Sequence, residues 1–252
     1  MKTLEEFLNG KVKRYNHRGF IEGDPVSIPH RFSRKEDIEI SGFLTALISW
    51  GRRDIIVRSA SDLMDRMEYQ PYDFVMYAGS FELKRISGFY YRTFHADDLL
   101  FILEALRNIY QKKIGLEGLA ATGFQNQKMV RDAIVSLREG LLKYPHLSRS
   151  EKHLANPATG SAAKRINMFL RWMVRKDDKG VDFGLWKSIP SSALMCPLDI
   201  HSGRVARKLG LLTRKQNDWK AVEELTANLR TFDPEDPVRY DYALFGMGVM
   251  EG

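Results

Sequence analysis

The spacing of apolar residues constrains the fold of this 252-residue chain more than any other feature, because it follows the helical period almost throughout. Ile40, Phe43, Leu44, Leu47 and Ile48 lie at the i, i+3, i+4, i+7 and i+8 positions of one helix face. The same spacing recurs in three further sets, which are Ile56, Ala60, Leu63 and Met67; Leu99, Ile102, Leu103, Leu106 and Ile109; and Val130, Ala133, Ile134, Leu137 and Leu141. Alternating, strand-like runs are nearly absent. The sequence therefore predicts an all-α protein.

Local signals indicate where several helices begin. Ser33 and Glu36 have the spacing of a capping box ahead of the first helix. Later in the chain, Val205 and Leu209 indicate a short helix, and Asp236-Pro237 has the form of a cap followed by an N1 proline. Another helix is indicated by the spacing of Trp219, Val222, Thr226 and Leu229. Polar or Gly/Pro-containing connections are expected at about 23–33, 68–96, 111–127, 144–160 and 176–197.

The domain organisation follows from the uniform composition. No repeat, low-complexity tract or flexible linker divides the chain. We expect one compact helical unit over residues 1–252, within which residues 1–145 and 150–252 would form two lobes.

The composition also narrows the classes of function. A single cysteine, Cys196, excludes an internal disulfide and a cysteine-ligated metal cluster. The formal net charge of +7 favours an anionic partner such as nucleic acid. No stretch approaches the roughly 20 apolar residues of a membrane span, and the N-terminus lacks the apolar core of a signal peptide. We therefore expect a cytoplasmic protein with no membrane partner, no metal and no cofactor.

A helix expected to begin near Ser161 carries the first candidate catalytic residue. Its apolar stripe leaves Lys164, Asn167, Arg171 and Arg175 on the polar face, with Lys164 in the first turn. The N–H groups and dipole of a helix N-terminus disfavour the ammonium form of a lysine. A neutral amine could attack a sugar carbon and form a Schiff base, and the N–H groups after Gly160 could hold a phosphate. A solvated surface lysine with no chemical role is the alternative interpretation.

Asp199 is the second candidate. The sequence Pro197-Leu198-Asp199, followed by His201, Arg204 and Arg207, indicates an aspartate that caps a short basic helix. Backbone N–H groups keep such a carboxylate ionised, so it could stabilise an oxocarbenium-like sugar or take a proton from an amine. His201 is expected to be structural or to contact a phosphate, because no second ligand stands at metal-site spacing.

These two segments resemble a known enzyme superfamily. Lys164-Arg-Ile-Asn-Met-Phe-Leu-Arg resembles the catalytic-lysine helix of 8-oxoguanine DNA glycosylase/lyases. Pro197-Leu-Asp199-Ile-His201-Ser-Gly-Arg204-Val-Ala-Arg207 resembles the Asp-x-His-x-x-Arg-Val-x-x-Arg motif of helix-hairpin-helix (HhH-GPD) glycosylases, and Asp241-Tyr-Ala-Leu-Phe-Gly246 resembles their closing helix. Overall the chain resembles a bacterial family that is distantly similar to these enzymes, nearest to the 8-oxoguanine types.

The resemblance implies a fold, a reaction and a partner. It implies the two-lobed all-α glycosylase architecture, with damaged double-stranded DNA in a cleft and a flipped nucleotide entering it. Lys164 would be the nucleophile and Asp199 the assisting acid of a DNA repair glycosylase/AP lyase for a damaged, oxidised-purine type of base. Further residues would contact the DNA, namely Gly160, Ser161, Arg165, Arg171, His201, Arg204 and Arg207. The alternative is a non-catalytic nucleic-acid-binding protein on the same fold.

The sequence departs from the superfamily pattern in three places. The segment Asn156-Pro157-Ala158-Thr159-Gly160-Ser161 has one glycine where the hairpin normally has two, and a long insert separates Lys164 from Asp199. No four-cysteine iron–sulfur motif follows Gly248. The first departure places the phosphate contact before Lys164 in question, and the second concerns the shape of the pocket.

Overall fold

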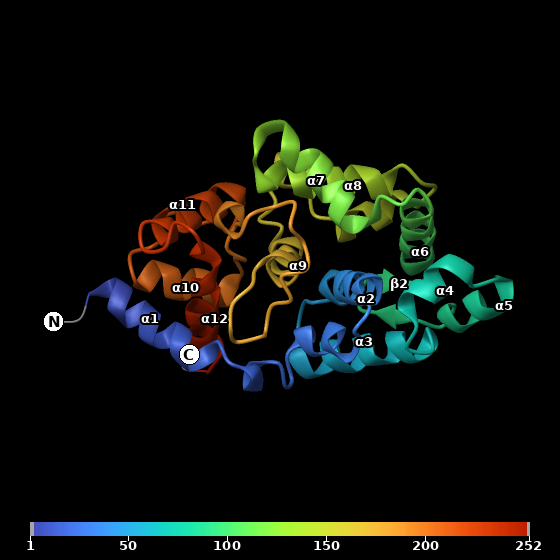
Figure 1. Ribbon diagram of the computed structural model, residues 1–252, viewed down its shortest axis with the longest axis horizontal. Helices are drawn as coiled ribbons and strands as arrows, with labels where there is room; N and C mark the ends of the chain where they lie inside the picture. Colours follow the sequence, from blue (N-terminus) through green and yellow to red (C-terminus); the bar gives the residue numbers. More distant parts are fainter. Residues whose placement is uncertain (1–2, 251–252) are drawn as a thin grey trace. The chain divides into compact units, whose positions relative to one another are not determined.

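The computed structural model describes residues 3–250, and almost all of its regular structure is helical (Figure 1). The predicted all-α class is confirmed, since the only strands in this part of the chain are β1 (Tyr90–Tyr91) and β2 (Phe94–His95). The chain divides into two compact units. Gly23–Ala155 forms the central unit, and Met1–Glu22 together with Asn156–Gly252 forms the discontinuous unit.

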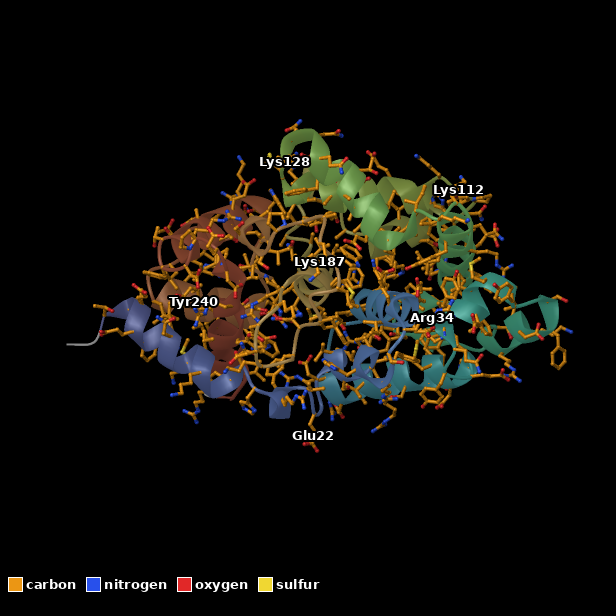
Figure 2. The ribbon with its side chains drawn as sticks, viewed as in Figure 1. Glu22, Arg34, Lys112, Lys128, Lys187 and Tyr240 are labelled. Atoms are coloured by element: carbon orange, nitrogen blue, oxygen red, sulfur yellow. The ribbon has the colours of Figure 1, made fainter. Side chains whose placement is uncertain are left out.

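The central unit is built on α2 (Lys35–Leu47), in which every residue from Ile38 to Leu47 is buried. The helices α7 (Gly115–Gln127) and α8 (Val130–Leu142) lie side by side (Figure 1). They pack so closely that a Cβ atom added at Gly123 would come within 2.2 Å of the Asp132 carbonyl oxygen. The surface is charged, as the exposed Lys112 and Lys128 illustrate (Figure 2). Its other helices are η2 (Pro25–Ser27), η3 (Pro29–Arg31), α3 (Arg53–Arg66), α4 (Pro71–Tyr77), α5 (Ser80–Leu83), η4 (Lys84–Ile86), α6 (Ala96–Gln111) and η5 (Ser148–His153).

Three expectations for the central unit are wrong in detail. The predicted connection 68–96 contains α4, α5 and the β1–β2 hairpin, and the connection 111–127 is largely the helix α7. Glycines that weaken the helix signal of 111–127 allow close packing against α8. Ser33 does not cap α2, because that helix begins at Lys35 with Arg34 at its N-cap and no side-chain capping bond.

The discontinuous unit brings the two ends of the described chain together. A capping box of Thr3 and Glu6 begins α1 (Leu4–Tyr15), which lies against α12 (Asp241–Met250) (Figure 1). A Cβ at Gly246 of α12 would come within 2.4 Å of the Tyr15 ring, so the two helices pack without room for a side chain there. Its other helices are η1 (Arg18–Phe20), η6 (Pro157–Thr159), α9 (Lys164–Val174), η7 (Ser191–Ala193), α10 (Ile200–Lys208), α11 (Trp219–Arg230) and η8 (Pro237–Tyr240).

The boundaries of the two units differ from those of the two predicted lobes at residues 1–22. The sequence grouped them with 23–145, whereas they belong with Asn156–Gly252. The physical reason is the apolar face of α1, whose Leu8, Val12 and Tyr15 are buried in the discontinuous unit. At the other end of this unit, Asp236-Pro237 begins the short helix η8, and α12 follows at Asp241.

The insert 176–197 is a folded part of the discontinuous unit. Phe183 and Trp186 donate their backbone N–H groups to the carbonyl oxygens of Trp172 and Met173, at 2.8 and 2.9 Å. The buried Trp186 ring meets Phe169 edge to face, with 5.4 Å between ring centroids. Every residue of α9 from Ile166 to Val174 is buried as a result.

Candidate active site

Lys164 is the first residue of α9, three residues later than the helix start expected near Ser161. The N-cap Ala163 has left-handed backbone angles, with φ 46° and ψ 35°, which turn the chain sharply into the helix. The Lys164 side chain lies along the helix, with its Nζ 3.8 Å from the Met168 Sδ one turn later.

Asp199 caps α10, as the sequence predicts. Its Oδ1 accepts the backbone N–H groups of His201 and Ser202 at 2.8 and 2.9 Å, and its own N–H donates to the Ser202 Oγ at 2.9 Å. These bonds form a complete capping box. They hold the carboxylate rigidly at the start of the helix and leave Oδ2 to face Lys164.

The structure brings the two candidate catalytic residues together. Lys164 Nζ lies 3.8 Å from Asp199 Oδ2, and both side chains are 25% exposed. A pair at this distance can exchange a proton after a small movement or through one water. The same distance describes an ordinary ion pair, so the geometry permits chemistry without requiring it.

A second carboxyl group, that of Asp241, interacts electrostatically with this pair. Asp241, the first residue of α12, is only 5% exposed. Burial raises the pKa of its carboxyl to about 6, although the positive charges of Arg171 and Lys164 act in the opposite direction. Cys196 lies in the same region, where burial and the negative charge of Asp241 raise the pKa of its thiol. Sequence reasoning missed Asp241, because nothing in its local pattern distinguishes it from a helix-start aspartate.

A buried ionic network holds α9 to the insert and to α12. Arg171 pairs with Asp182 of the insert and with Asp241, and Arg175 also donates to Asp182. The Tyr242 hydroxyl donates to the Asp182 Oδ2 at 2.9 Å, and the Arg171 guanidinium lies 4.4 Å from the Tyr242 ring centroid. Two further carboxylates, Asp177 and Asp236, pair with Arg175.

This network corrects the expectation for Arg171. The sequence places Arg171 on the polar face of its helix and predicts a contact with DNA, but its exposed fraction is 3% and its charge is matched by carboxylates. Asn167 and Arg175 are likewise buried. Burial opposes the charge of Arg175, but Asp182 and Asp236 outweigh it and raise its pKa. A helical wheel cannot anticipate this, because the insert covers the polar face.

The turn before α9 does not offer the backbone donors expected for a phosphate. The N–H of Ala158 donates to the Asn156 side chain, and those of Thr159, Gly160 and Ser161 donate to carbonyl oxygens within the same turn. Gly160 adopts φ 96°, and its position is exposed. The amides of Gly160 and Ser161 are therefore already used, which removes the predicted backbone contact at these two residues.

The other side chains predicted to contact DNA differ in how exposed they are and in whether they already bind other parts of the protein. His201 and Arg204 are exposed on α10, and Arg204 donates to the Gly248 carbonyl at 3.1 Å. Arg165 is partly buried, and burial lowers the pKa of its guanidinium to about 10, which leaves it charged at neutral pH. Arg207 instead holds the α10–α11 loop (residues 209–218), because it donates to the carbonyl oxygens of Arg214 and Lys215 and to the Asn217 side chain.

Two kinds of feature are absent among the residues that the structure describes. Within 3–250 there is no group of three or more His, Cys, Asp or Glu side chains that could hold a metal ion. No helix in that range has the length and apolar character needed to cross a membrane.

Comparison with known proteins identifies the family. A family model with the description "Protein of unknown function (DUF2400)" matches residues 24–250. The chain belongs to this family. The comparisons with curated proteins and with solved structures gave no match. The matched range includes Lys164, Asp199 and Asp241, so all three acidic and basic groups of the candidate site lie inside the DUF2400 domain.

Proposed function

We propose that this DUF2400 protein is a DNA glycosylase with AP lyase activity on the helix-hairpin-helix glycosylase architecture, acting on a damaged base of the oxidised-purine type. The observation that carries the proposal is the 3.8 Å separation of Lys164 Nζ and Asp199 Oδ2. These residues are separated by a long insert in the sequence, yet they meet at the starts of two helices, α9 and α10. Both side chains are 25% exposed, so the amine and the carboxylate are accessible from solvent.

The proposed reaction begins at C1′ of the flipped nucleotide. The neutral Lys164 amine attacks C1′, a C–N bond forms, and the glycosidic bond breaks with its electron pair leaving on the base. Asp199 accepts a proton from the amine, and the departing base takes up a proton. Opening of the sugar ring gives a Schiff base between Lys164 and C1′. Loss of a proton from C2′ and of the 3′ phosphate then cleaves the strand.

The packing around the pair suits this chemistry. The capping box keeps Asp199 in place, and the ionic network below α9 fixes the helix that carries Lys164. Pre-organised groups of this kind lower the cost of reaching the transition state. Base flipping would add selectivity, because a damaged base is cheaper to unstack.

The decisive test is covalent trapping. Wild-type protein is incubated with duplexes that carry an oxidised purine or an abasic site, and borohydride is added to reduce the Schiff base to a stable amine. We expect a protein–DNA adduct with wild type, none with Lys164→Ala, and roughly 100-fold slower trapping with Asp199→Asn, the scale of one general acid–base group. Lys208→Ala, an exposed lysine of α10, serves as the matched control and should trap like wild type.

The alternative is a protein that binds nucleic acid without chemistry. It is favoured by the fact that a 3.8 Å Lys–Asp contact is also an ordinary ion pair. Wild-type protein that binds every duplex but neither traps nor cleaves any of them would establish the alternative and refute the lyase.

A further inference from the structure

The α10–α11 loop is joined to both halves of the candidate site. Asn217 donates its side-chain amide to the Asp199 carbonyl at 3.0 Å. Trp219 donates its backbone N–H to the Gly160 carbonyl at 2.9 Å, and Ser161 forms a β-bridge with Asp218. The loop therefore has a fixed position relative to the cap of α10 and to the turn that leads into Lys164.

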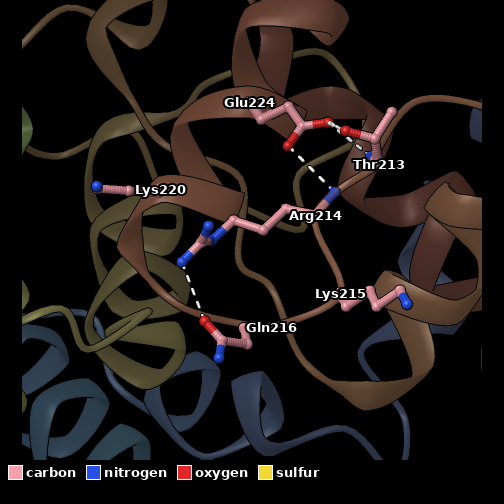
Figure 3. A pocket seen from close by; sticks show the side chains of 6 residues that line it. All are labelled: Thr213, Arg214, Lys215, Gln216, Lys220 and Glu224. Carbon is pink, nitrogen blue, oxygen red and sulfur yellow. Dashed lines mark hydrogen bonds between the residues drawn. The ribbon is translucent and has the colours of Figure 1, made fainter.

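A cavity of about 520 Å³ opens on this loop. Its lining is Thr213, Arg214, Lys215, Gln216, Lys220 and Glu224 (Figure 3). The Arg214 guanidinium extends on the side of the loop where Lys220 lies, and the Lys215 amine extends on the other side. Cations on two sides of the cavity, from the loop and from the first turn of α11, suit an extended polyanion better than a single small anion.

The carboxylates near the cavity are engaged within the protein. Glu224 accepts the backbone N–H groups of Thr213 and Arg214 and the Thr213 hydroxyl, and Asp218 pairs with Arg214. Lys215 and Lys220 are exposed and take part in no ion pair with any residue from 3 to 250. Their two positive charges are thus directed at solvent beside the site.

The turn before α9 and the burial of Arg171 leave fewer phosphate contacts near Lys164 than the sequence predicts. The backbone amides of Gly160 and Ser161 donate within their own turn, so they cannot hold a phosphate. Arg171 is buried in the ionic network. Two of the expected sources of phosphate contacts are therefore missing, while Lys215 of the adjoining loop and Lys220 of α11 form no ion pair within residues 3–250.

We propose that the α10–α11 loop and the first turn of α11 bind the phosphodiester backbone of the DNA strand beside the reacting nucleotide, with Lys215 of the loop and Lys220 of α11 each contacting a phosphate. This inference rests on the proposed function for the identity of the polyanion. The loop positions the strand because it is hydrogen-bonded to the Asp199 carbonyl and to the Gly160 carbonyl.

The test measures how DNA binding depends on salt. Fluorescence anisotropy gives the affinity for a duplex with a tetrahydrofuran abasic analogue, which has no aldehyde and cannot form a Schiff base. Each lost phosphate contact lowers the slope of log K against log salt by about 1, so Lys215→Ala/Lys220→Ala should lower the slope by about 2. Lys13→Ala/Lys143→Ala removes the same charge from exposed positions on α1 and after α8, and should leave the slope unchanged.

The outcomes separate this inference from the proposed function. Equal slopes for the two double variants and wild type would overturn the loop contact, whatever the trapping experiment shows. A slope reduced only for an RNA duplex of the same sequence would overturn it as well. A reduced slope on DNA without any borohydride adduct would support the loop contact and refute the lyase.

Discussion

Asp241 gives the sharpest test of the electrostatics at the site. Its carboxyl is almost fully buried, and burial raises its pKa from the usual 3.8 to about 6 although Arg171 pairs with it. Replacement of Asp241 by Asn keeps the shape and a hydrogen-bond acceptor for Arg171 but removes the titrating charge. Because Asp182 also pairs with Arg171, that guanidinium retains a counter-charge in the variant.

The size of the expected change in stability follows from the shift in the Asp241 pKa. A change from 3.8 to about 6 corresponds to about 3 kcal/mol between the two protonation states. The folded carboxyl binds its proton more tightly than the unfolded one, so this group favours the folded state fully below pH 3.8 and loses that contribution as the pH rises through 6. Between pH 5 and pH 8 this titration lowers the free energy of unfolding of the wild type by about 1.5 kcal/mol, and Asp241→Asn lacks the titrating group and so lacks this loss.

Urea unfolding at pH 5 and pH 8 measures the effect. The free energy of unfolding of Asp241→Asn, relative to wild type, should rise by about 1.5 kcal/mol from pH 5 to pH 8, since all other titrating groups are common to both proteins. Asp178→Asn, at an exposed position whose pKa is lowered by Lys179, should show no change over this range, because that carboxyl is ionised in both the folded and the unfolded state from pH 5 to pH 8. A relative stability of Asp241→Asn that stays constant or falls with pH would show that Arg171 outweighs burial, and the reasoning would be refuted.

Two further predictions concern the packing that supports the site. Gly246→Ala places a Cβ against the Tyr15 ring and should lower the free energy of unfolding, measured in urea, by about 1–3 kcal/mol. Gly10→Ala has no atom within 4 Å of its added Cβ and should raise the free energy of unfolding by up to about 1 kcal/mol. Equal effects of the two substitutions would contradict the α1–α12 packing. Asp182→Asn removes the carboxylate that both buried arginines share and should cost about 3–5 kcal/mol. The exposed Asp178→Asn in the same insert should be close to wild type, and similar losses for the two variants would mean that the network contributes little.

The sequence predicted those features that depend on local pattern. The periodicity around Phe43 and Leu44 identified α2, and the cap at Asp199 was recognisable from its neighbours. The proximity of Lys164 and Asp199 came from resemblance and from the order of two motifs, because spacing alone does not place residues on either side of an insert together.

Other features depend on tertiary contacts that no local pattern contains. The helix α7 was read as a connection because of its glycines, yet Gly123 is required there by the Asp132 carbonyl of α8. The predicted DNA contact of Arg171 is wrong because the helical period shows a polar face but not the insert that covers it. Burial is a property of the whole unit, and charged residues in particular are misassigned when their partners are remote.

The pairing of α1 with α12 bears on how the protein forms during synthesis. The central unit is one continuous segment, so it can fold as soon as it has left the ribosome. The discontinuous unit cannot, since Leu8 and Val12 of α1 lack their packing partner until α12 has been translated. The apolar face of α1 therefore has no partner until α12 has been translated, whereas the central unit can form its own core before that point.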